Sequence, residues 1–442
     1  MFPRSRGGPA VAGRGPVMVL VLLVLAGALA GCGGEPGRLV YWASNQGASA
    51  ARDREVLRAQ LARFTAETGI PVEVEVIPWN DLLNRVLGAA TSGTGPDLVD
   101  LGNTWSASLQ ATGAFLEFDE PLLDRLGGRE RFLPGSMSSA GAPGGPPASV
   151  PLYGLSYAVF YDEQRFREAG IERVPRTWPE FLAVAERLTT GGRAGLTLPG
   201  ASYAQNAHLA YLFGVQQGAR FIDERGAAAF TAPGAVDAVL RYVRLMSGSG
   251  VVRADDAERS SMPAAVAEFT ARRAAMLIAQ SSALPTIAAS GMPVEYVGVF
   301  PLPLPDPLPP GGSPARTHVG GSNVAVLRDS PRREESLRLV EFLTSRRTQV
   351  ELNRSYGSLP VVTDAYDGPE FTTGRAAVFA DLLAQHSVPL PMIPNESRFE
   401  TTVGAAVRDL FARAATGGRV GREQVRAELE RAQQRMRAAG GA

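Results

Sequence analysis

The chain has 442 residues, and 45% of them are hydrophobic, which is enough apolar material for two or three domains. Its 44 basic and 44 acidic residues cancel, and this balance argues against a dedicated nucleic-acid-binding protein, whose phosphate contacts need a basic excess. Every basic residue is an arginine, so the chemistries that depend on a P-loop, kinase or Schiff-base lysine are excluded. A single cysteine and three scattered histidines leave no basis for a disulfide or a metal cage, and we expect no metal and no cofactor.

The N-terminal segment is typical of a secretory signal. Arginines precede an apolar run, 17–30, that is shorter than the roughly 20 residues of a membrane-spanning helix. The run ends in Leu29-Ala30-Gly31-Cys32, which is similar to the bacterial lipobox, whose cysteine is lipidated. An ordinary signal peptide with a chance cysteine is the alternative. We expect 1–31 to be a signal peptide and 32–37 a tether, so that the mature chain is lipid-anchored outside the cytoplasmic membrane through Cys32.

The next part of the chain alternates short apolar strands with amphipathic helices. Such alternation predicts right-handed crossovers and an α/β fold with a doubly wound, mostly parallel sheet. The expected elements, in order, are a strand at Leu39–Trp42, a helix at Asp53–Thr68, a strand at Val72–Val76, a helix at Asp81–Ala90 capped by Asn80, a strand at Asp97–Leu101 and a helix near Ser106–Thr112.

A second α/β series follows. Thr177-Trp178-Pro179-Glu180 has the pattern of a capping box and predicts a helix that runs to Leu188. The other expected elements are an apolar run at Val150–Tyr161, strands at Leu196–Leu198, Ala274–Ala279, Val294–Phe300 and Asn323–Leu327, and helices at Ala204–Gln217, Gly234–Met246 and Pro331–Ser345. Pro301–Arg316 is a proline- and glycine-rich loop, and the remainder is mostly helical to Met436. The chain therefore predicts two α/β lobes.

Polar and aromatic residues follow three strands of the first series. The turns are Trp42-Ala43-Ser44-Asn45-Gln46, Pro78-Trp79-Asn80 and Gly102-Asn103-Thr104-Trp105. Ligands of parallel sheets bind beyond the carboxyl ends of the strands, and aromatic faces with amides and hydroxyls suit a sugar. Packing in the core is the alternative for Trp42 and Trp105, and capping or turn formation is the alternative for the asparagines.

Blocks of sequence from Leu39 to Met436 resemble the bacterial extracellular solute-binding proteins of ABC importers, the family of the maltose-binding protein. The blocks are Phe64-Thr65-Ala66-Glu67-Thr68-Gly69-Ile70, Gly95-Pro96-Asp97-Leu98-Val99, Val174-Pro175-Arg176-Thr177-Trp178, Arg273-Ala274-Ala275-Met276, Pro301-Leu302-Pro303, Gly320-Gly321-Ser322, Phe342-Leu343-Thr344-Ser345 and Gly357-Ser358-Leu359-Pro360. Their order and spacing over the whole mature chain carry the resemblance.

The resemblance implies two lobes joined by three crossings, with a hinge that closes on the ligand. The crossings are expected near Val150-Pro151, Ile278–Gln280 and Asp329–Pro331. The first lobe is then 38–150 plus 280–329, and the second is 151–279 plus 330–442. By the same similarity, the chain is expected to be a monomer that serves the transmembrane subunits of an ABC permease. The balanced charge predicts that it binds no nucleic acid.

The resemblance also assigns ligand-binding residues in the cleft between the lobes. Those of the first lobe are Asn45, Gln46, Asn80, Asn103, Thr104, Trp105, Ser281, Ser282 and Gly321, and those of the second are Tyr153, Ser156, Tyr203 and Asn206. Tyr203 is either an aromatic platform or a packing residue at the start of its helix. The maltose-binding pattern has an aromatic residue where this chain has Ser281-Ser282, and a tryptophan near Phe399, so a sugar other than a maltodextrin is expected.

Three functions compete at this point. The first is a carbohydrate-binding lipoprotein that takes a mono- or oligosaccharide and performs no catalysis. The second is the same fold with another solute, such as glycerol phosphate, a polyamine or a metal chelate; a phosphate needs convergent arginines, and the first-lobe turns contain none. The third is an anchored glycan hydrolase, which needs paired carboxylates. Asp97, Asp100, Glu117 and Asp119 are acidic, but Asp97 begins its strand at the end away from the cleft.

Overall fold

Valines that alternate with glutamates form an edge strand with one solvent-exposed face. In the computed structural model, which describes residues 37–47 and 49–438, this strand is β2 (Val72–Ile77), and Glu73 and Glu75 are exposed. It pairs in parallel with β1 (Leu39–Ser44), with Leu39 opposite Val72 and Ser44 opposite Ile77. Both strands therefore end at the same edge of the sheet.

The first sheet has five strands in the order β2-β1-β3-β10-β4. β3 (Leu98–Gly102) is parallel to β1, whereas β10 (Gly320–Val326) is antiparallel to both β3 and β4 (Val150–Leu155). Apolar side chains cover both faces of this sheet. Its helices are α2 (Ala50–Thr68), α3 (Trp79–Ser92), α4 (Ser106–Gln110), α5 (Glu120–Arg125), α6 (Pro134–Ser138), α13 (Arg333–Thr344) and α14 (Arg346–Tyr356). We call this sheet with its helices the first lobe.

The second sheet has four strands in the order β6-β7-β5-β8. They are β5 (Tyr157–Asp162), β6 (Ala194–Thr197), β7 (Ala274–Gln280) and β8 (Val297–Phe300). The helices of this second lobe are α7 (Glu163–Glu168), α8 (Trp178–Leu188), α9 (Tyr203–Gln216), α10 (Pro233–Ser247), α11 (Met262–Thr270), α12 (Ala283–Ala289), α15 (Gly374–Gln385), α16 (Glu396–Ala415) and α17 (Arg422–Ala438). A short sheet of β9 (Thr317–His318) and β11 (Ser387–Val388) completes the strands.

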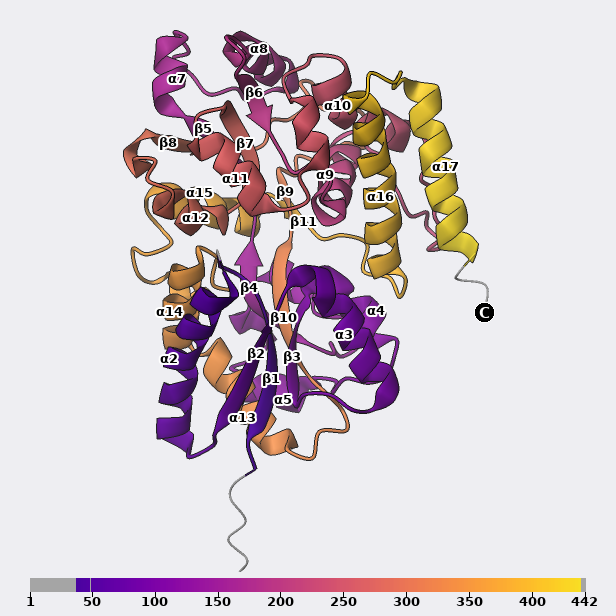
Figure 1. Cartoon of the computed structure of the whole chain (residues 1–442). Helices are drawn as coiled ribbons and strands as arrows, with labels where there is room; N and C mark the ends of the chain where they lie inside the picture. The colour runs from indigo at the N-terminus through magenta and orange to yellow at the C-terminus, as the bar shows by residue number, and fades with distance from the viewer. Residues whose placement is uncertain (1–36, 48, 439–442) are drawn as a thin grey trace, which may run out of the picture.

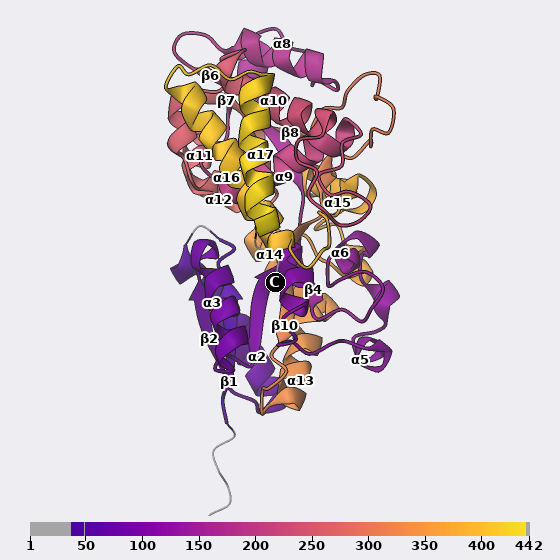
Figure 2. The ribbon, with the colours of Figure 1, turned by 90° about the vertical axis from the view of Figure 1, so that its right-hand side faces the viewer.

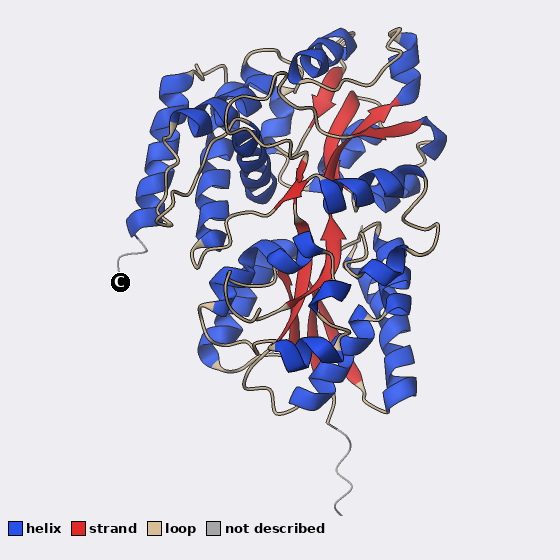
Figure 3. Cartoon of the chain, turned by 180° about the vertical axis from the view of Figure 1, so that it is seen from behind, coloured by secondary structure: helices blue, strands red, loops and turns tan. Residues whose placement is uncertain are grey.

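The two lobes lie one above the other, as the sequence predicted for a two-lobed α/β protein (Figure 1). β4 and β10 run from the first lobe toward the second, which is clear from behind (Figure 3). α16 and α17 pack side by side on one flank of the second lobe, and the side view places them in front (Figure 2). Within the described part of the chain, no helix combines the length and the apolar content that crossing a membrane requires.

The strands divide between the lobes at different points from those expected. The apolar run at 150–161 is two strands in different sheets, so the first crossing lies at Ser156. β8 pairs with β5, which puts 297–300 in the second sheet rather than in the first lobe. α13 and α14 share the first lobe's core, although the expected division put them in the second. A buried apolar strand or helix has the same sequence pattern in either lobe. The lobe to which it belongs depends on the segments that it packs against in the tertiary structure.

Helix caps show one agreement and one difference. Thr177 accepts a hydrogen bond from the Glu180 backbone and Glu180 reaches back, so the predicted capping box at α8 is confirmed. Asn80 does not cap α3, because the helix begins one residue before it, at Trp79. Asn45 supplies that cap from the neighbouring loop: its Oδ1 accepts a hydrogen bond from the Trp79 backbone N–H at 2.9 Å.

Candidate ligand site between the two lobes

The three polar turns predicted at the strand ends meet at one cavity. It has a volume of about 610 Å³ and is lined by residues of both lobes. The predicted ligand residues that line it are Asn45, Gln46, Asn80, Asn103, Thr104, Trp105, Tyr203, Ser282 and Gly321. Because β1, β2 and β3 are parallel, their carboxyl ends open on this side of the sheet, and the turns come together.

Aromatic side chains form much of the wall. Trp79 and Trp105 of the first lobe meet edge to face, with ring centroids 5.6 Å apart at 72°. Tyr203 and Tyr157 face the cavity from the second lobe. Burial, followed by two nearby carboxylates, raises the pKa of Tyr203 to about 12, so its hydroxyl stays protonated at neutral pH. Such a wall offers flat apolar faces together with hydroxyl and indole donors.

Several polar side chains at the cavity also hold the structure in place. The Gln46 amide donates to Ser44 Oγ at 2.7 Å. The Asn103 amide donates to Ser139 Oγ at 3.1 Å and to the Val319 carbonyl at 2.7 Å. With Asn45 at the start of α3, these bonds fix the positions of the turns before any ligand enters.

Four predicted ligand residues lie outside the lining, and most have other partners. Tyr153 packs against Tyr356 with centroids 5.6 Å apart, and Ser156 Oγ donates to the Phe379 carbonyl at 2.8 Å. Asn206 donates to the Gly200 carbonyl at 2.7 Å, because it lies on the opposite face of α9 from Ala204 and His208, which line the cavity. Ser281 is buried, and its hydroxyl has no partner among the described residues.

Two aromatic residues considered from the sequence also lie outside the lining. Phe399 is fully buried against Phe221 and Phe230 in the core of the second lobe, so it adds no surface to the cavity. Trp42 is half-buried, and the Arg85 guanidinium lies over its ring at 4.3 Å.

A polar cluster in the cavity wall was not predicted from the sequence. It consists of Tyr157, His208, His318 and Glu400, which come from β5, α9, β9 and α16. His208 follows Ala204 by one helical turn, so helical spacing from the predicted α9 residues was a usable signal. Glu400 follows Phe399 directly, but nothing local marks it as a cavity residue.

Glu400 connects the two lobes. Its Oε2 accepts a hydrogen bond from Trp105 Nε1 at 2.8 Å and a longer one, 3.4 Å, from Thr104 Oγ1, both in the first lobe. Its Oε1 lies 2.8 Å from His208 Nε2 in the second lobe. The carboxylate is only 3% exposed, so these partners replace water for a charge that is costly to bury alone.

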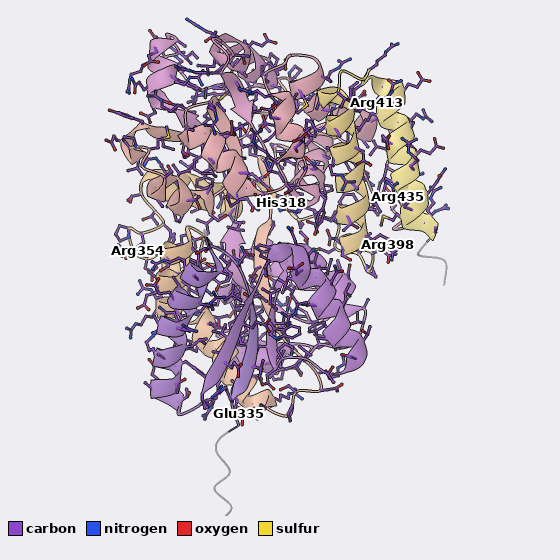
Figure 4. All side chains as sticks on the ribbon, in the orientation of Figure 1. His318, Glu335, Arg354, Arg398, Arg413 and Arg435 are labelled. Carbon is purple, nitrogen blue, oxygen red and sulfur yellow. The ribbon has the colours of Figure 1, made fainter. Side chains whose placement is uncertain are left out.

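His318 lies at the junction of the lobes, as its label in Figure 4 shows. Its ring is stacked 4.1 Å from that of His208, and neither of its nitrogens has a hydrogen-bond partner in the described part of the chain. Burial, followed by the neighbouring His208, lowers the pKa of His318 well below its ordinary value. His318 is therefore a neutral imidazole that lines the cavity with unused hydrogen-bonding capacity.

The charge of the lining is sparse. Among the described residues that line the cavity there is no arginine, and Glu400 is the one carboxylate. Arg398, Arg413 and Arg435 lie along α16 and α17, away from His318 (Figure 4). No group of three or more His, Cys, Asp or Glu among the described residues is placed to hold a metal ion.

The acidic residues weighed for hydrolysis do not line the cavity. Asp97 accepts hydrogen bonds from Ser330 Oγ at 2.6 Å and from the Val40 N–H at 2.9 Å, and Asp119 caps α5. Asp100 is fully buried in β3, where it accepts hydrogen bonds from Tyr41 and Ser44 of β1, and Glu117 is exposed.

Two α/β lobes with a polar and aromatic cavity between them define the class of two-lobed solute-binding proteins. The chain matches the family model described as bacterial extracellular solute-binding protein over residues 47–350, and it belongs to that family. It is a solute-binding protein of an ABC transporter, and an extracytoplasmic location fits this family.

Individual relatives are similar at low identity. The sn-glycerol-3-phosphate-binding periplasmic protein UgpB of Rhizobium meliloti (strain 1021) is 24% identical over 420 residues, which are 91% of this chain and 93% of that protein. The structure of maltose-bound T. maritima MalE3 has a TM-score of 0.76 at 20% identity, covering 91% of this chain and 99% of its own. The solute-binding protein of Thermotoga lettingae with α-D-tagatose has a TM-score of 0.77 at 20% identity, covering 90% and 99%.

Proposed function

We propose that this protein binds a mono- or oligosaccharide between its lobes and delivers it to the transmembrane subunits of an ABC permease. The lobes close on the ligand, because closure brings second-lobe groups such as Tyr203 into contact with a ligand held by the first lobe. The protein acts as a binding protein without catalysis, and it is anchored through a lipid on Cys32. Cys32 lies outside the described residues, and its lipobox-like sequence supports the anchor.

The observation that carries the sugar proposal is the combination of aromatic walls with a lining that has no arginine. Trp79, Trp105 and Tyr203 offer faces for the C–H side of a sugar ring, and Asn80 and Ser282 offer groups for its hydroxyls. A phosphate or phosphodiester ligand would instead face Glu400 with no arginine beside it.

A thermal-shift panel tests this proposal. The panel contains maltose, α-D-tagatose, D-glucose and trehalose, with sn-glycerol-3-phosphate and spermidine as the non-sugar arms. A ligand present at about 100 times its Kd adds about 2.7 kcal/mol to the free energy of unfolding, so a true ligand raises the melting temperature clearly. We expect a carbohydrate to do so. A shift given by sn-glycerol-3-phosphate or spermidine alone overturns the sugar proposal.

Small-angle scattering tests the closure. The carbohydrate that raises the melting temperature most should lower the radius of gyration of the protein, while a carbohydrate that gives no shift serves as the control. A bound carbohydrate that leaves the scattering curve unchanged contradicts hinge closure.

A further inference from the structure

A path of hydrogen bonds runs across the cavity wall from the first lobe to Tyr157. Trp105 Nε1 contacts Glu400 Oε2 at 2.8 Å, and Glu400 Oε1 contacts His208 Nε2 at 2.8 Å. His208 Nδ1 lies 3.2 Å from the Tyr157 hydroxyl. All four side chains line the cavity.

The chemistry of the partners fixes the direction of each bond. An indole N–H only donates and a carboxylate only accepts, so the proton between Glu400 and His208 belongs to Nε2. A neutral imidazole with a proton on Nε2 has a bare Nδ1, which accepts. When His208 is neutral, the Tyr157 hydroxyl therefore donates its proton to His208 Nδ1. Burial, followed by the nearby Glu400, raises the pKa of Tyr157 above its usual value, so this proton stays on the phenol.

We propose that Glu400 is a positioning residue that, through His208, makes Tyr157 a hydrogen-bond acceptor toward the ligand. This inference rests on the proposed function, because it explains how the proposed sugar site distinguishes one sugar from another. With its proton engaged, the Tyr157 oxygen presents only lone pairs to the cavity. The site then favours a ligand hydroxyl that donates at this point and disfavours an analogue in which fluorine, which only accepts, replaces that hydroxyl.

Glu400→Gln reverses the donor and acceptor roles between residue 400, His208 and Tyr157 without breaking their hydrogen bonds. The amide must turn its oxygen to Trp105, because the indole can only donate, and its NH₂ then faces His208 Nε2. His208 Nε2 must now accept, so the imidazole proton moves to Nδ1 and is donated to the Tyr157 oxygen. The Tyr157 hydroxyl becomes free to donate to the ligand, while the bond from Trp105 across the lobes is kept.

Histidine ¹⁵N NMR of the protein with the panel carbohydrate that gives the largest thermal shift measures the His208 tautomer directly, because the lobes are closed in that state and the chain contains only three histidines. His208 is assigned by its loss in His208→Gln. We expect the Nε2–H form in the wild type and the Nδ1–H form in Glu400→Gln. A wild-type His208 that is in the Nδ1–H form or doubly protonated at about pH 8 overturns the proposal, as does an unchanged tautomer in folded Glu400→Gln.

Glu396→Gln is the matched control. Glu396 is also buried on α16, one turn before Glu400, but it does not line the cavity and no described residue hydrogen-bonds its carboxyl oxygens. This variant should keep the wild-type tautomer. A tautomer change here as large as in Glu400→Gln would assign the effect to any carboxyl-to-amide substitution in this part of α16 rather than to the Glu400–His208 bond and would overturn the proposal.

Titration calorimetry measures the consequence for specificity. The probes are the carbohydrate of the panel that gives the largest thermal shift and its monodeoxyfluoro analogues. We expect one fluoro position to cost the wild type at least fivefold more affinity than it costs Glu400→Gln, and Tyr157→Phe to abolish that difference. If each fluoro analogue loses the same affinity for the wild type as for Glu400→Gln, the proposed acceptor role of Tyr157 is overturned. If no carbohydrate binds, the proposed function fails, while NMR of the free wild type still decides the His208 tautomer, because the Glu400–His208 bond lies within the second lobe.

Discussion

Trp105 has two neighbours that no local pattern in the sequence connects to it. Its ring meets Trp79 edge to face, and its indole nitrogen donates to Glu400, which lies almost 300 positions later in the chain. Core packing and a position in the ligand site were the alternatives for Trp105. Both describe part of its environment, since the side chain is 5% exposed and also lines the cavity.

Trp105→Ala should lower the affinity for the bound carbohydrate at least about fivefold, because an aromatic contact of this kind contributes about 1 kcal/mol. Titration calorimetry measures the loss. Trp42→Ala is the control, since Trp42 is a half-buried tryptophan of the same lobe that does not line the cavity. Equal affinities for the wild type and the folded Trp105→Ala variant would remove Trp105 from the site.

Asp100 predicts a pH dependence of stability. It accepts hydrogen bonds from the Tyr41 hydroxyl at 2.6 Å and from the Ser44 N–H at 3.0 Å, but burial dominates and raises its pKa from 3.8 to about 7. The folded state then holds this proton more tightly than the unfolded state, so stability falls as the pH rises between these values. At about 1.4 kcal/mol per pKa unit, the shift corresponds to about 4 kcal/mol.

Asp100→Asn removes this titration. Urea denaturation should show that the stability advantage of the wild type over Asp100→Asn shrinks as the pH rises from about 5 to about 8, by about 2.7 kcal/mol, because about two pKa units of the shift lie in this range. A difference between the two proteins that is independent of pH contradicts the raised pKa.

At the scale of elements, local signals fixed the helix ends that depend on neighbours in sequence. The capping box at Thr177 and Glu180 involves residues three apart, and it was predicted. The cap of α3 involves Asn45 and Trp79, which are brought together only by the pairing of β1 with β2. Asn80 was assigned that role because sequence reasoning considers the nearest suitable side chain.

Thr177→Ala should lower the free energy of unfolding by about 1 kcal/mol, because the first turn of α8 loses its cap. Chemical denaturation measures this loss. α8 lies at the end of the second lobe farthest from the first lobe (Figure 1), so ligand affinity should not change. Thr190→Ala, an exposed threonine just beyond the same helix, should change stability by less than about 0.5 kcal/mol. Equal effects of the two substitutions contradict the role of the cap.

At the scale of the whole molecule, the site exists only when both lobes are present. The first lobe supplies the tryptophans and the turn amides, and the second supplies Tyr203, His208 and Glu400. The described chain begins at the start of β1, at the end of the first lobe away from the second (Figure 1). A tether through Cys32, as proposed, would join the first lobe at the edge of its sheet opposite the carboxyl ends of β1 and β2, where the cavity lies.

Cys32→Ala should move the protein from the membrane fraction to the soluble extracytoplasmic fraction, because the thiol is the proposed site of the lipid. Fractionation followed by immunoblotting measures this. Retention of the variant in the membrane fraction contradicts the lipid anchor, and ligand binding by the released protein serves as the control for folding.

The sequence by itself determined the features that depend on short-range patterns. Hydrophobic periodicity gave the elements of both lobes, and the rule that parallel strands end at one edge brought the turns at Asn45, Asn80 and Trp105 to one cavity. Family resemblance added the expectation of a hinged ligand cleft between the two lobes. Tertiary structure alone decided which sheet β8 joins, that α13 and α14 pack on the first lobe, and that His208, His318 and Glu400 meet at the cleft. These outcomes depend on contacts between segments far apart in the chain, and residue spacing carries no record of such contacts.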